Sequence, residues 1–230
     1  QTERRTAHDA AIAQLAARGL VYECTCTRRE ILEAPSAPHA APGAYPGTCR
    51  TRTEQERADA RAAIAPRLPA LRLRSEVTEL SFEDVLLGEV TASIDDFVLK
   101  RGDGAIAYNL AVVVDDADMG VDQVVRGDDL ASSTPRQMLL QRLLGLPTPM
   151  YAHVPLVLGP SGARLAKRDG AVTLEDLAEQ GVSAESVRDE LAASLGLSQT
   201  GESLSMAELL ERFDPQRLPR EAWVWSGATS

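Results

Sequence analysis

The sequence has no long hydrophobic run and few cysteines. No apolar stretch approaches the roughly 18 residues that a membrane-spanning helix needs, which argues against a membrane protein. Only three cysteines occur in 230 residues. Because this number is odd, and because Cys24 and Cys26 are too close for an easy mutual bridge, a secreted disulfide scaffold is disfavoured. We therefore expect a cytoplasmic protein in a reducing setting, with no membrane partner.

The sequence also lacks an excess of positive charge. Lys and Arg number 24 against 34 Asp and Glu, a net charge of -10, which argues against a protein that coats nucleic acid through net charge alone. The local distribution differs, because residues 50–74 hold seven arginines and only three acidic side chains. This stretch is a candidate contact with phosphates, and the alternative is a solvated helix face. The length suits one domain or two small ones.

Helix signals are frequent along the chain. Capping boxes, in which Ser or Thr is followed three residues later by an acidic residue, begin at Thr27, Thr53, Thr173 and Ser205. Glycines 19 and 145 are placed to end helices. The helices expected before residue 169 span residues 2–18, 27–32, 53–64 and 133–144. Beyond residue 169 the pattern predicts a small helical module.

Short extended pieces between polar turns predict strands. They cover residues 20–24, 71–74, 77–82, 89–93, 97–100, 123–126 and 154–158. The apolar run 105–114 includes three consecutive valines, so we expect a strand that is covered on both faces. Strands that alternate with helices in this way predict an α/β fold with a doubly wound sheet.

Three cysteines form a candidate metal site. Cys24 and Cys26 are two residues apart, so on an extended segment their thiols point to the same side, and Cys49 is the obvious third ligand. A closed zinc site needs a fourth ligand, and both His39 and Tyr45 lie between the second and third cysteines. Ligand chemistry alone favours His39, because phenolate is a rare zinc ligand. The alternative is three reduced thiols that only fill core space.

A basic loop and two polar side chains are further candidates. Residues 159–170 form a glycine-flanked basic loop after a predicted strand, which suits a polyphosphate, and a solvated surface turn is the alternative. Arg126 lies at the carboxyl end of a predicted strand and could pair with a carboxylate. Tyr108, on the predicted apolar strand, could add a hydroxyl. Either side chain could instead be a satisfied structural residue.

Four segments carry a family resemblance. Residues 107–116, 125–130, 133–137 and 164–170, in this order and spacing, resemble the glutamyl-tRNA synthetase family of class I synthetases, and the likeness extends from Gln1 to the tail at residues 222–225. The closest likeness is to a short branch of that family that attaches glutamate to the queuosine base of tRNA(Asp). The resemblance implies a Rossmann-like doubly wound catalytic domain whose amino-terminal part is missing from this chain, an inserted zinc-containing acceptor-binding subdomain and a helical module.

The resemblance also implies domain limits and partners. The expected divisions are residues 1–19 and 96–160 for the catalytic domain, 20–95 for the zinc-containing subdomain, and 161–230 for the signature loop and a helical module that resembles a stem-contact domain. Glutamate, ATP with Mg²⁺, one structural Zn²⁺ and queuosine-bearing tRNA(Asp) are the implied partners, and we expect a monomer.

Residue roles follow from the matching motif positions. Tyr108 and Arg126 match glutamate-binding positions, and Lys167 matches the catalytic, ATP-binding lysine of the mobile signature loop, which here comprises Arg164, Leu165, Ala166, Lys167 and Arg168. In the short branch, zinc is bound by two cysteines in a Cys-x-Cys pair, a tyrosine and a third cysteine. These map onto Cys24, Cys26, Tyr45 and Cys49 and displace His39.

Two departures from the family pattern limit what the resemblance implies. The loop has Arg164 and Ala166 where close relatives commonly carry Lys and Ser, so one hydroxyl is lost while the essential cation is kept. The His-Ile-Gly-His type motif and an acidic glutamate-binding segment belong upstream of Gln1, which indicates an amino-terminal gap.

Two other functions remain open. One is a glutamyl-tRNA synthetase, truncated at both ends, that charges tRNA(Glu). The short stretch after Arg168 disfavours it, because a full synthetase continues into an anticodon-binding region. The other is a non-catalytic zinc-containing RNA-binding relic, which the absent upstream motif and Ala166 would support.

Overall fold

The chain folds into two compact units in a computed structural model that describes residues 2–34, 44–164 and 173–225. The first unit comprises the described parts of residues 1–83, 89–124 and 131–151, and the second those of 84–88, 125–130 and 152–230. Within the described residues, no helix has both the length and the apolar character to cross a membrane.

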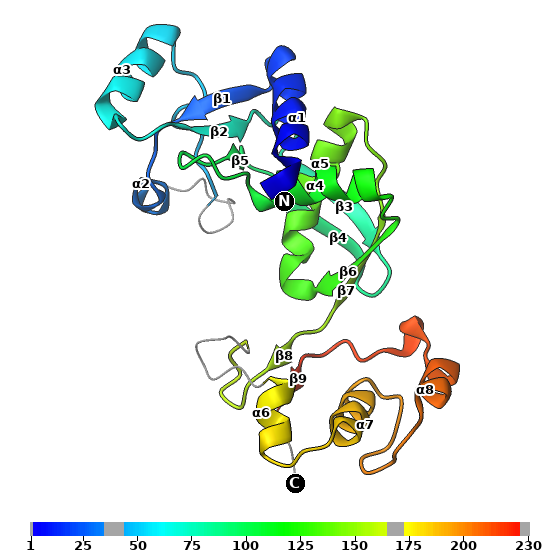
Figure 1. Cartoon of the computed structure of the whole chain (residues 1–230). Coiled ribbons are helices and arrows are strands. Elements are labelled where there is room, and N and C mark those ends of the chain that lie inside the picture. Colours follow the sequence, from blue (N-terminus) through cyan, green and yellow to red (C-terminus); the bar gives the residue numbers. More distant parts are fainter. Residues whose placement is uncertain (1, 35–43, 165–172, 226–230) are drawn as a thin grey trace. The chain divides into compact units, whose positions relative to one another are not determined.

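Helices and a small antiparallel sheet build the first unit (Figure 1). Strand β2 lies between β1 and β5 and runs antiparallel to both, with Val21 opposite Leu73. The helical elements are η1 (Thr2–Arg4), α1 (Arg5–Ala17), α2 (Arg28–Glu33), α3 (Glu54–Ile64), α4 (Tyr108–Met119) and α5 (Thr134–Leu144). The strands of this sheet are β1 (Val21–Cys24), β2 (Ala70–Leu73) and β5 (Val98–Lys100).

A second sheet has the strand order β4-β3-β7-β6. Its strands are β3 (Glu79–Asp84), β4 (Gly88–Ser93), β6 (Gln123–Gly127) and β7 (Met150–Val154), and the 3-10 helix η2 (Asp128–Ser133) follows β6. The described residues thus contain mixed α/β sheets, as the sequence predicts in outline.

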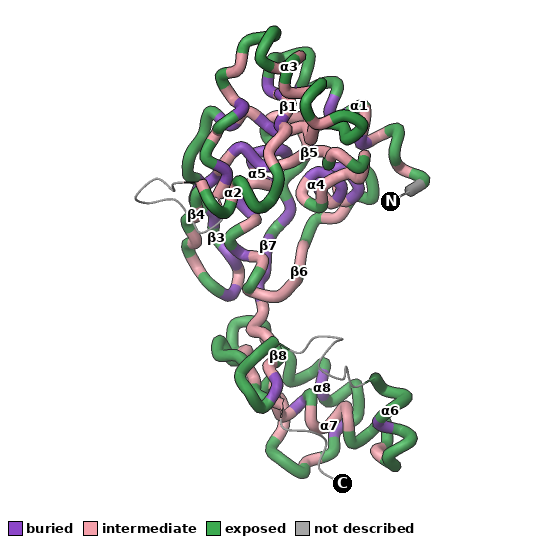
Figure 2. The backbone as a smooth tube through the Cα atoms, turned by 90° about the vertical axis from the view of Figure 1, so that its left-hand side faces the viewer, coloured by how far each residue is buried: buried purple, intermediate pink, exposed green. Residues whose placement is uncertain are grey.

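The second unit carries the predicted helical module. Strand β8 (Val157–Leu158) pairs in parallel with β9 (Trp223–Val224). Between them lie α6 (Leu174–Glu179), α7 (Ala184–Ser194), α8 (Met206–Arg212) and the 3-10 helix η4 (Pro215–Arg217). Burial is sparse in this module and concentrated in the first unit (Figure 2).

Local signals placed most helix ends correctly. All four capping boxes form, at Thr27, Thr53, Thr173 and Ser205. Gly145 ends α5 in the left-handed conformation with φ of 72°, a conformation that glycine adopts without the steric cost of a side chain.

The expected strand at residues 105–114 is wrong. Tyr108 begins helix α4, which packs against α1 and α5 and ends at Gly120 with φ of 70°. Its buried apolar residues follow helical spacing, and the core lies on that side of the helix: they are Leu110, Ala111, Val113 and Val114. The consecutive valines favour a strand locally, but burial between two helices outweighs that weak preference.

The expected strand at residues 154–158 is also wrong in extent. The structure has two separate strands there, β7 ending at Val154 and β8 beginning at Val157. Pro155 lies between them and has no backbone N–H to donate to a ladder, so a continuous strand is interrupted.

The burial pattern of α4 predicts unequal effects of two alanine substitutions on one helix. Leu110 is 0% exposed and Met119 is 74% exposed. We expect Leu110→Ala to lower the free energy of unfolding by about 2–5 kcal/mol because it leaves a cavity. Met119→Ala should change it by less than about 0.5 kcal/mol. Urea unfolding of the complete gene product measures both, and equal losses would contradict the helical assignment.

Candidate functional site

Three thiols meet at the end of β1. Cys24 ends this strand, Cys26 follows two residues later, and Cys49 comes from the turn that precedes α3. Their sulfur atoms lie within 4.8 Å of one another, and those of Cys26 and Cys49 are 3.5 Å apart. None of the three forms a disulfide. The structure thus confirms that the predicted cysteines converge.

Tyr45 directs its hydroxyl into this group of thiols. The Cys24 thiol donates to Tyr45 Oη over 3.5 Å, and Cys26 Sγ lies 4.0 Å from the same oxygen. The backbone N–H of Cys49 donates to Tyr45 Oη over 2.8 Å, which fixes the ring relative to the third cysteine. Tyr45 is 7% exposed. His39, which ligand chemistry alone favours, lies outside the described residues.

The size of the cluster fits one tetrahedral metal ion. With Zn–S distances of about 2.3 Å, the ligand atoms of a tetrahedron lie roughly 3.8 Å apart. The separations between the donor atoms here fall around that value. Three thiols and one phenol oxygen supply four donors. Sulfurs that only fill core space would not require the hydroxyl of Tyr45 among them.

Hydrogen bonds within the cluster separate the pKa values of its members. The neighbouring Cys24 side chain is the main cause that lowers the pKa of Cys49, to about 4. The interaction with Cys49, together with burial, raises the pKa of Cys24, and burial raises the pKa of Tyr45. The cluster therefore stabilises one thiolate, which is the form of cysteine that binds metals.

Two consecutive carboxylates hold the turn that carries Tyr45 and Cys49. Asp95 accepts from the backbone N–H of Tyr45 over 2.9 Å and pairs with Arg136 of α5 over 2.8 Å. Asp96 is 6% exposed and accepts from Arg50 over 2.6 Å. Asp96 also accepts from Tyr22 of β1 over 2.7 Å, so the cluster is attached both to the first sheet and to α5.

The arginines of residues 50–74 are engaged inside the chain. Each of the seven makes a hydrogen bond or an ion pair within the protein, which for Arg57 is with Glu54 one turn earlier in the same helix. Two of them, Arg67 and Arg72, line an open cavity of about 1180 Å³ beside Cys26, together with Arg28 and Arg101. These contacts leave the predicted contact with nucleic acid untested, and it stays a prediction.

The predicted glutamate-binding residues occupy defined positions in separate units. Tyr108 is the first residue of α4 and is 51% exposed, so it lies on a helix and not on the expected strand. Arg126 is the next-to-last residue of β6, at the carboxyl end of a strand as predicted. Its Nε donates to Nε2 of His153 over 3.1 Å.

The basic loop is described only in its first part. Leu158 forms an antiparallel bridge with Arg164, and Gly159 N donates to Ala163 O over 2.8 Å, so a tight hairpin opens the loop. Arg164 pairs with Asp129. The remaining members of the predicted signature loop lie outside the described residues: Leu165, Ala166, Lys167 and Arg168.

Sequence reasoning missed Asp84 and His153. His153 is 0% exposed within β7, and its Nδ1 lies 2.6 Å from Oδ2 of Asp84, the last residue of β3. The available signal was a lone histidine inside an otherwise apolar strand, where burial requires a polar partner. Nothing in the sequence identifies that partner as Asp84.

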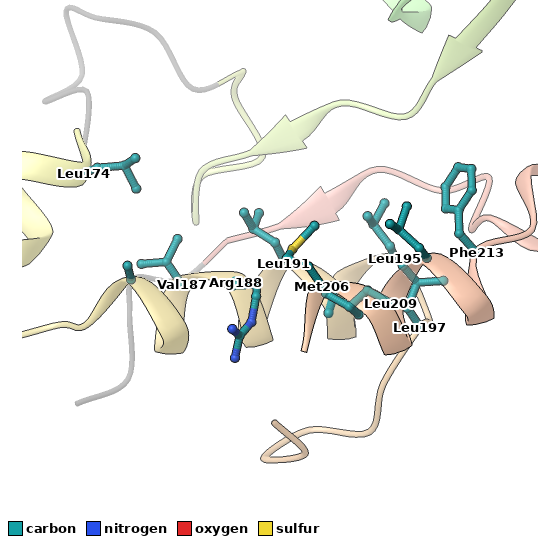
Figure 3. Close-up of a pocket in the computed structure, with 12 residues that line it drawn as sticks. Leu174, Val187, Arg188, Leu191, Leu195, Leu197, Met206, Leu209 and Phe213 are labelled. Carbon is teal, nitrogen blue, oxygen red and sulfur yellow. The ribbon is translucent and has the colours of Figure 1, made fainter. Parts of the chain in front are cut away.

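An apolar groove of about 450 Å³ lies in the helical module. Leu191 of α7 and Leu195, which follows that helix, line it together with Met206 and Phe213, and Arg188 is the one charged residue among its described lining (Figure 3). Met206 is 59% exposed. A lining with so little charge does not suit a polyphosphate, so this groove is not the expected ATP site.

Comparison with known proteins gives a consistent result. The family model described as tRNA synthetases class I (E and Q), catalytic domain, matches residues 1–227. A glutamyl-Q tRNA(Asp) synthetase of Nocardia farcinica is 58% identical over 97% of this chain and 70% of its own length. One from Symbiobacterium thermophilum is 47% identical over 96% and 70%.

A solved structure gives the fold. The crystal structure of a glutamate tRNA ligase from Elizabethkingia meningosepticum, in complex with its amino acid, superposes with a TM-score of 0.76 at 24% identity. The match covers 98% of this chain and 51% of that chain. The fold is therefore that of a class I synthetase catalytic domain.

Proposed function

Since the chain belongs to the class I tRNA synthetases of the glutamate and glutamine type, we propose that it activates glutamate with ATP and transfers the glutamyl group to the queuosine base of tRNA(Asp). The observation that carries this proposal is the similarity, along nearly the whole chain, to relatives named glutamyl-Q tRNA(Asp) synthetase. The enzyme is a ligase whose partners are glutamate, ATP and a tRNA.

The proposed reaction has two steps. The α-carboxylate of glutamate attacks the α-phosphorus of ATP, which gives glutamyl-adenylate and pyrophosphate, and a hydroxyl of queuosine then takes the acyl group with release of AMP. Positioning and charge neutralisation supply most of the rate. ATP brings Mg²⁺ with it, and we assign no protein ligand to that ion.

Three side chains have assigned roles in this proposal. Arg126 holds a carboxylate of the substrate at the end of β6, and Tyr108 offers its hydroxyl at the start of α4. Lys167 neutralises charge on the α-phosphate and the departing pyrophosphate. We also retain the expected zinc-containing subdomain at residues 20–95, a cytoplasmic location and a monomer as parts of the proposal.

Replacing Lys167 tests the activation step. We expect Lys167→Ala to slow glutamate-dependent ATP–pyrophosphate exchange about a hundredfold or more, the order of loss for one transition-state charge partner. Lys167→Arg, which keeps the charge, should lose less. Thermal unfolding should be unchanged in both. An exchange rate equal to that of the unsubstituted enzyme would remove the role assigned to Lys167.

We propose that the cysteine cluster binds one structural zinc ion through Cys24, Cys26, Cys49 and Tyr45. The support is the convergence of three sulfurs and a phenol oxygen at separations that suit a tetrahedron. The ion would join the end of β1 to the turn before α3, and it would hold three thiolates in a buried place. Its role is to fix this part of the fold.

Metal analysis of variants tests the zinc site and its fourth ligand. The purified protein should carry about one zinc per chain, as a single four-ligand site requires. Tyr45→Phe keeps the ring and removes the oxygen, so we expect zinc affinity to fall roughly tenfold or more. His39→Ala is the matched control and should retain zinc. Loss of zinc in His39→Ala, with retention in Tyr45→Phe, would reverse the ligand assignment.

Transfer of labelled glutamate identifies the acceptor. With ATP and the complete gene product, we expect label on tRNA(Asp) that contains queuosine and none on tRNA(Asp) that lacks it, because only the modified base offers the acceptor hydroxyl. A parallel reaction with tRNA(Glu) is the control. Label on tRNA(Glu) instead would indicate an ordinary glutamyl-tRNA synthetase, and no label on any tRNA would favour a non-catalytic RNA-binding protein.

A further inference from the structure

Three polar side chains form a continuous chain behind β6 in the second unit. Arg126 Nε lies 3.1 Å from Nε2 of His153, and His153 Nδ1 lies 2.6 Å from Oδ2 of Asp84. His153 is 0% exposed and Asp84 is 4% exposed. The buried pair of Asp84 and His153 thus supports Arg126, the residue that the proposed function places against the substrate.

The chemistry of arginine decides which groups donate and which accept in this hydrogen-bond network. A guanidinium only donates hydrogen bonds, so Nε2 of His153 must accept from Arg126. The proton of a neutral imidazole then lies on Nδ1, which donates to the carboxylate of Asp84. Either the other tautomer or a doubly protonated ring would place an N–H against the N–H of Arg126.

Asp84 is itself fixed in place at the end of β3. Its Oδ1 accepts from the backbone N–H groups of Leu86 and Leu87, each over 3.0 Å, and from that of His153 over 3.1 Å. Burial alone would raise the pKa of Asp84, but the hydrogen bonds from Leu87 and His153 outweigh it and lower the pKa. The carboxylate is therefore charged at neutral pH, and its Oδ2 is a strong acceptor for His153.

We propose that Asp84 and His153 are positioning residues for amino-acid recognition, which set the orientation of the Arg126 guanidinium. Because Nε already donates to His153, a carboxylate bound in bidentate fashion would be held by the two Nη groups. Fixing Nε removes rotational freedom from the guanidinium before the substrate arrives, and this lowers the entropic cost of binding. The inference rests on the proposed function, because it assumes that Arg126 binds a substrate carboxylate.

Two substitutions at residue 153 separate positioning from simple packing. Glutamine carries a side-chain oxygen that can take the place of Nε2 as acceptor, whereas asparagine is shorter and reaches only the Asp84 side. We expect His153→Asn to raise KM for glutamate roughly tenfold, the order for loss of one hydrogen bond to a charged group. His153→Gln should recover part of this loss. KM for ATP should stay within about twofold in both variants.

Asp84→Asn tests the carboxylate end of the Arg126–His153–Asp84 hydrogen-bond network. The amide can donate to Nδ1 and so favour the tautomer that opposes Arg126, and we expect KM for glutamate to rise by a similar factor, roughly tenfold. The matched control is His8→Asn. His8 is also a buried histidine beside a carboxylate, 2.8 Å from Asp115, but it lies in the first unit. This control should lower the thermal unfolding temperature and leave KM for glutamate within about twofold.

NMR of protein that contains ¹⁵N-labelled histidine tests the hydrogen-bond network independently of enzyme activity. The chain has three histidines, so comparison with His153→Gln assigns the signals of His153. From the hydrogen-bond geometry we expect the ring proton on Nδ1, with Nε2 accepting from Arg126. A proton on Nε2 would overturn the network, whether or not the enzyme is active.

The outcomes for this inference and for the proposed function can be told apart. If the unsubstituted protein fails to activate glutamate, the proposed function fails. If it is active and the folded Asp84 and His153 variants keep the original KM for glutamate, the positioning role is wrong and the pair only stabilises the β3–β4 turn. An equal rise in the KM values for glutamate and ATP would also count against it, because the proposed role acts through the carboxylate that Arg126 binds.

Discussion

The buried carboxylate of Asp96 is the constraint on which the arrangement of the first unit depends. An isolated buried charge is costly, so donors must converge on it from different parts of the chain. Tyr22 donates to it from β1 over 2.7 Å, Arg50 from the turn after Cys49 over 2.6 Å, and the backbone of Ser75 over 2.8 Å. One side chain thus brings together the strand that ends in Cys24 and the turn that carries Cys49, which are the two halves of the cysteine cluster.

The neighbouring Asp95 extends that constraint beyond the cluster. It binds the backbone of Tyr45 on one side and Arg136 of α5 on the other. Because α5 packs against α4, the helix that begins with Tyr108, the turn that carries Tyr45 and Cys49 shares one connected framework with a proposed substrate residue. A substitution at Asp95 therefore acts on the cysteine cluster through Tyr45 and on α5 through Arg136.

The sequence predicted correctly those features that depend on residues close together in the chain, and it failed where distant segments decide the structure. Capping boxes are local, since Thr27 binds a group three residues away, and all four formed where the sequence indicates. The cysteine pair was equally local. Helix α4 was mispredicted because three valines favour a strand, and only the neighbouring helices α1 and α5 decide otherwise. The choice of Tyr45 over His39 depended on family resemblance, because ligand chemistry alone points the other way.

The two buried histidine–carboxylate pairs show why tertiary context is needed to tell support from function. At His8, the arginine joins the carboxylate: Arg4 Nε donates to Asp115 over 2.6 Å, and that ion pair is bound into the packing of α1 and α4. At His153, the arginine contacts the imidazole instead, with Nε of Arg126 3.1 Å from Nε2. The order of the hydrogen-bonded side chains is therefore Asp84, His153, Arg126, with the cation last. The first arrangement neutralises a buried charge. In the second, the fixed carboxylate of Asp84 orients His153, and His153 orients the guanidinium of Arg126. Arg126 lies near the carboxyl end of a strand, where open α/β sheets bind their ligands. Residue types alone do not distinguish these cases, because both contain one Asp, one His and one Arg.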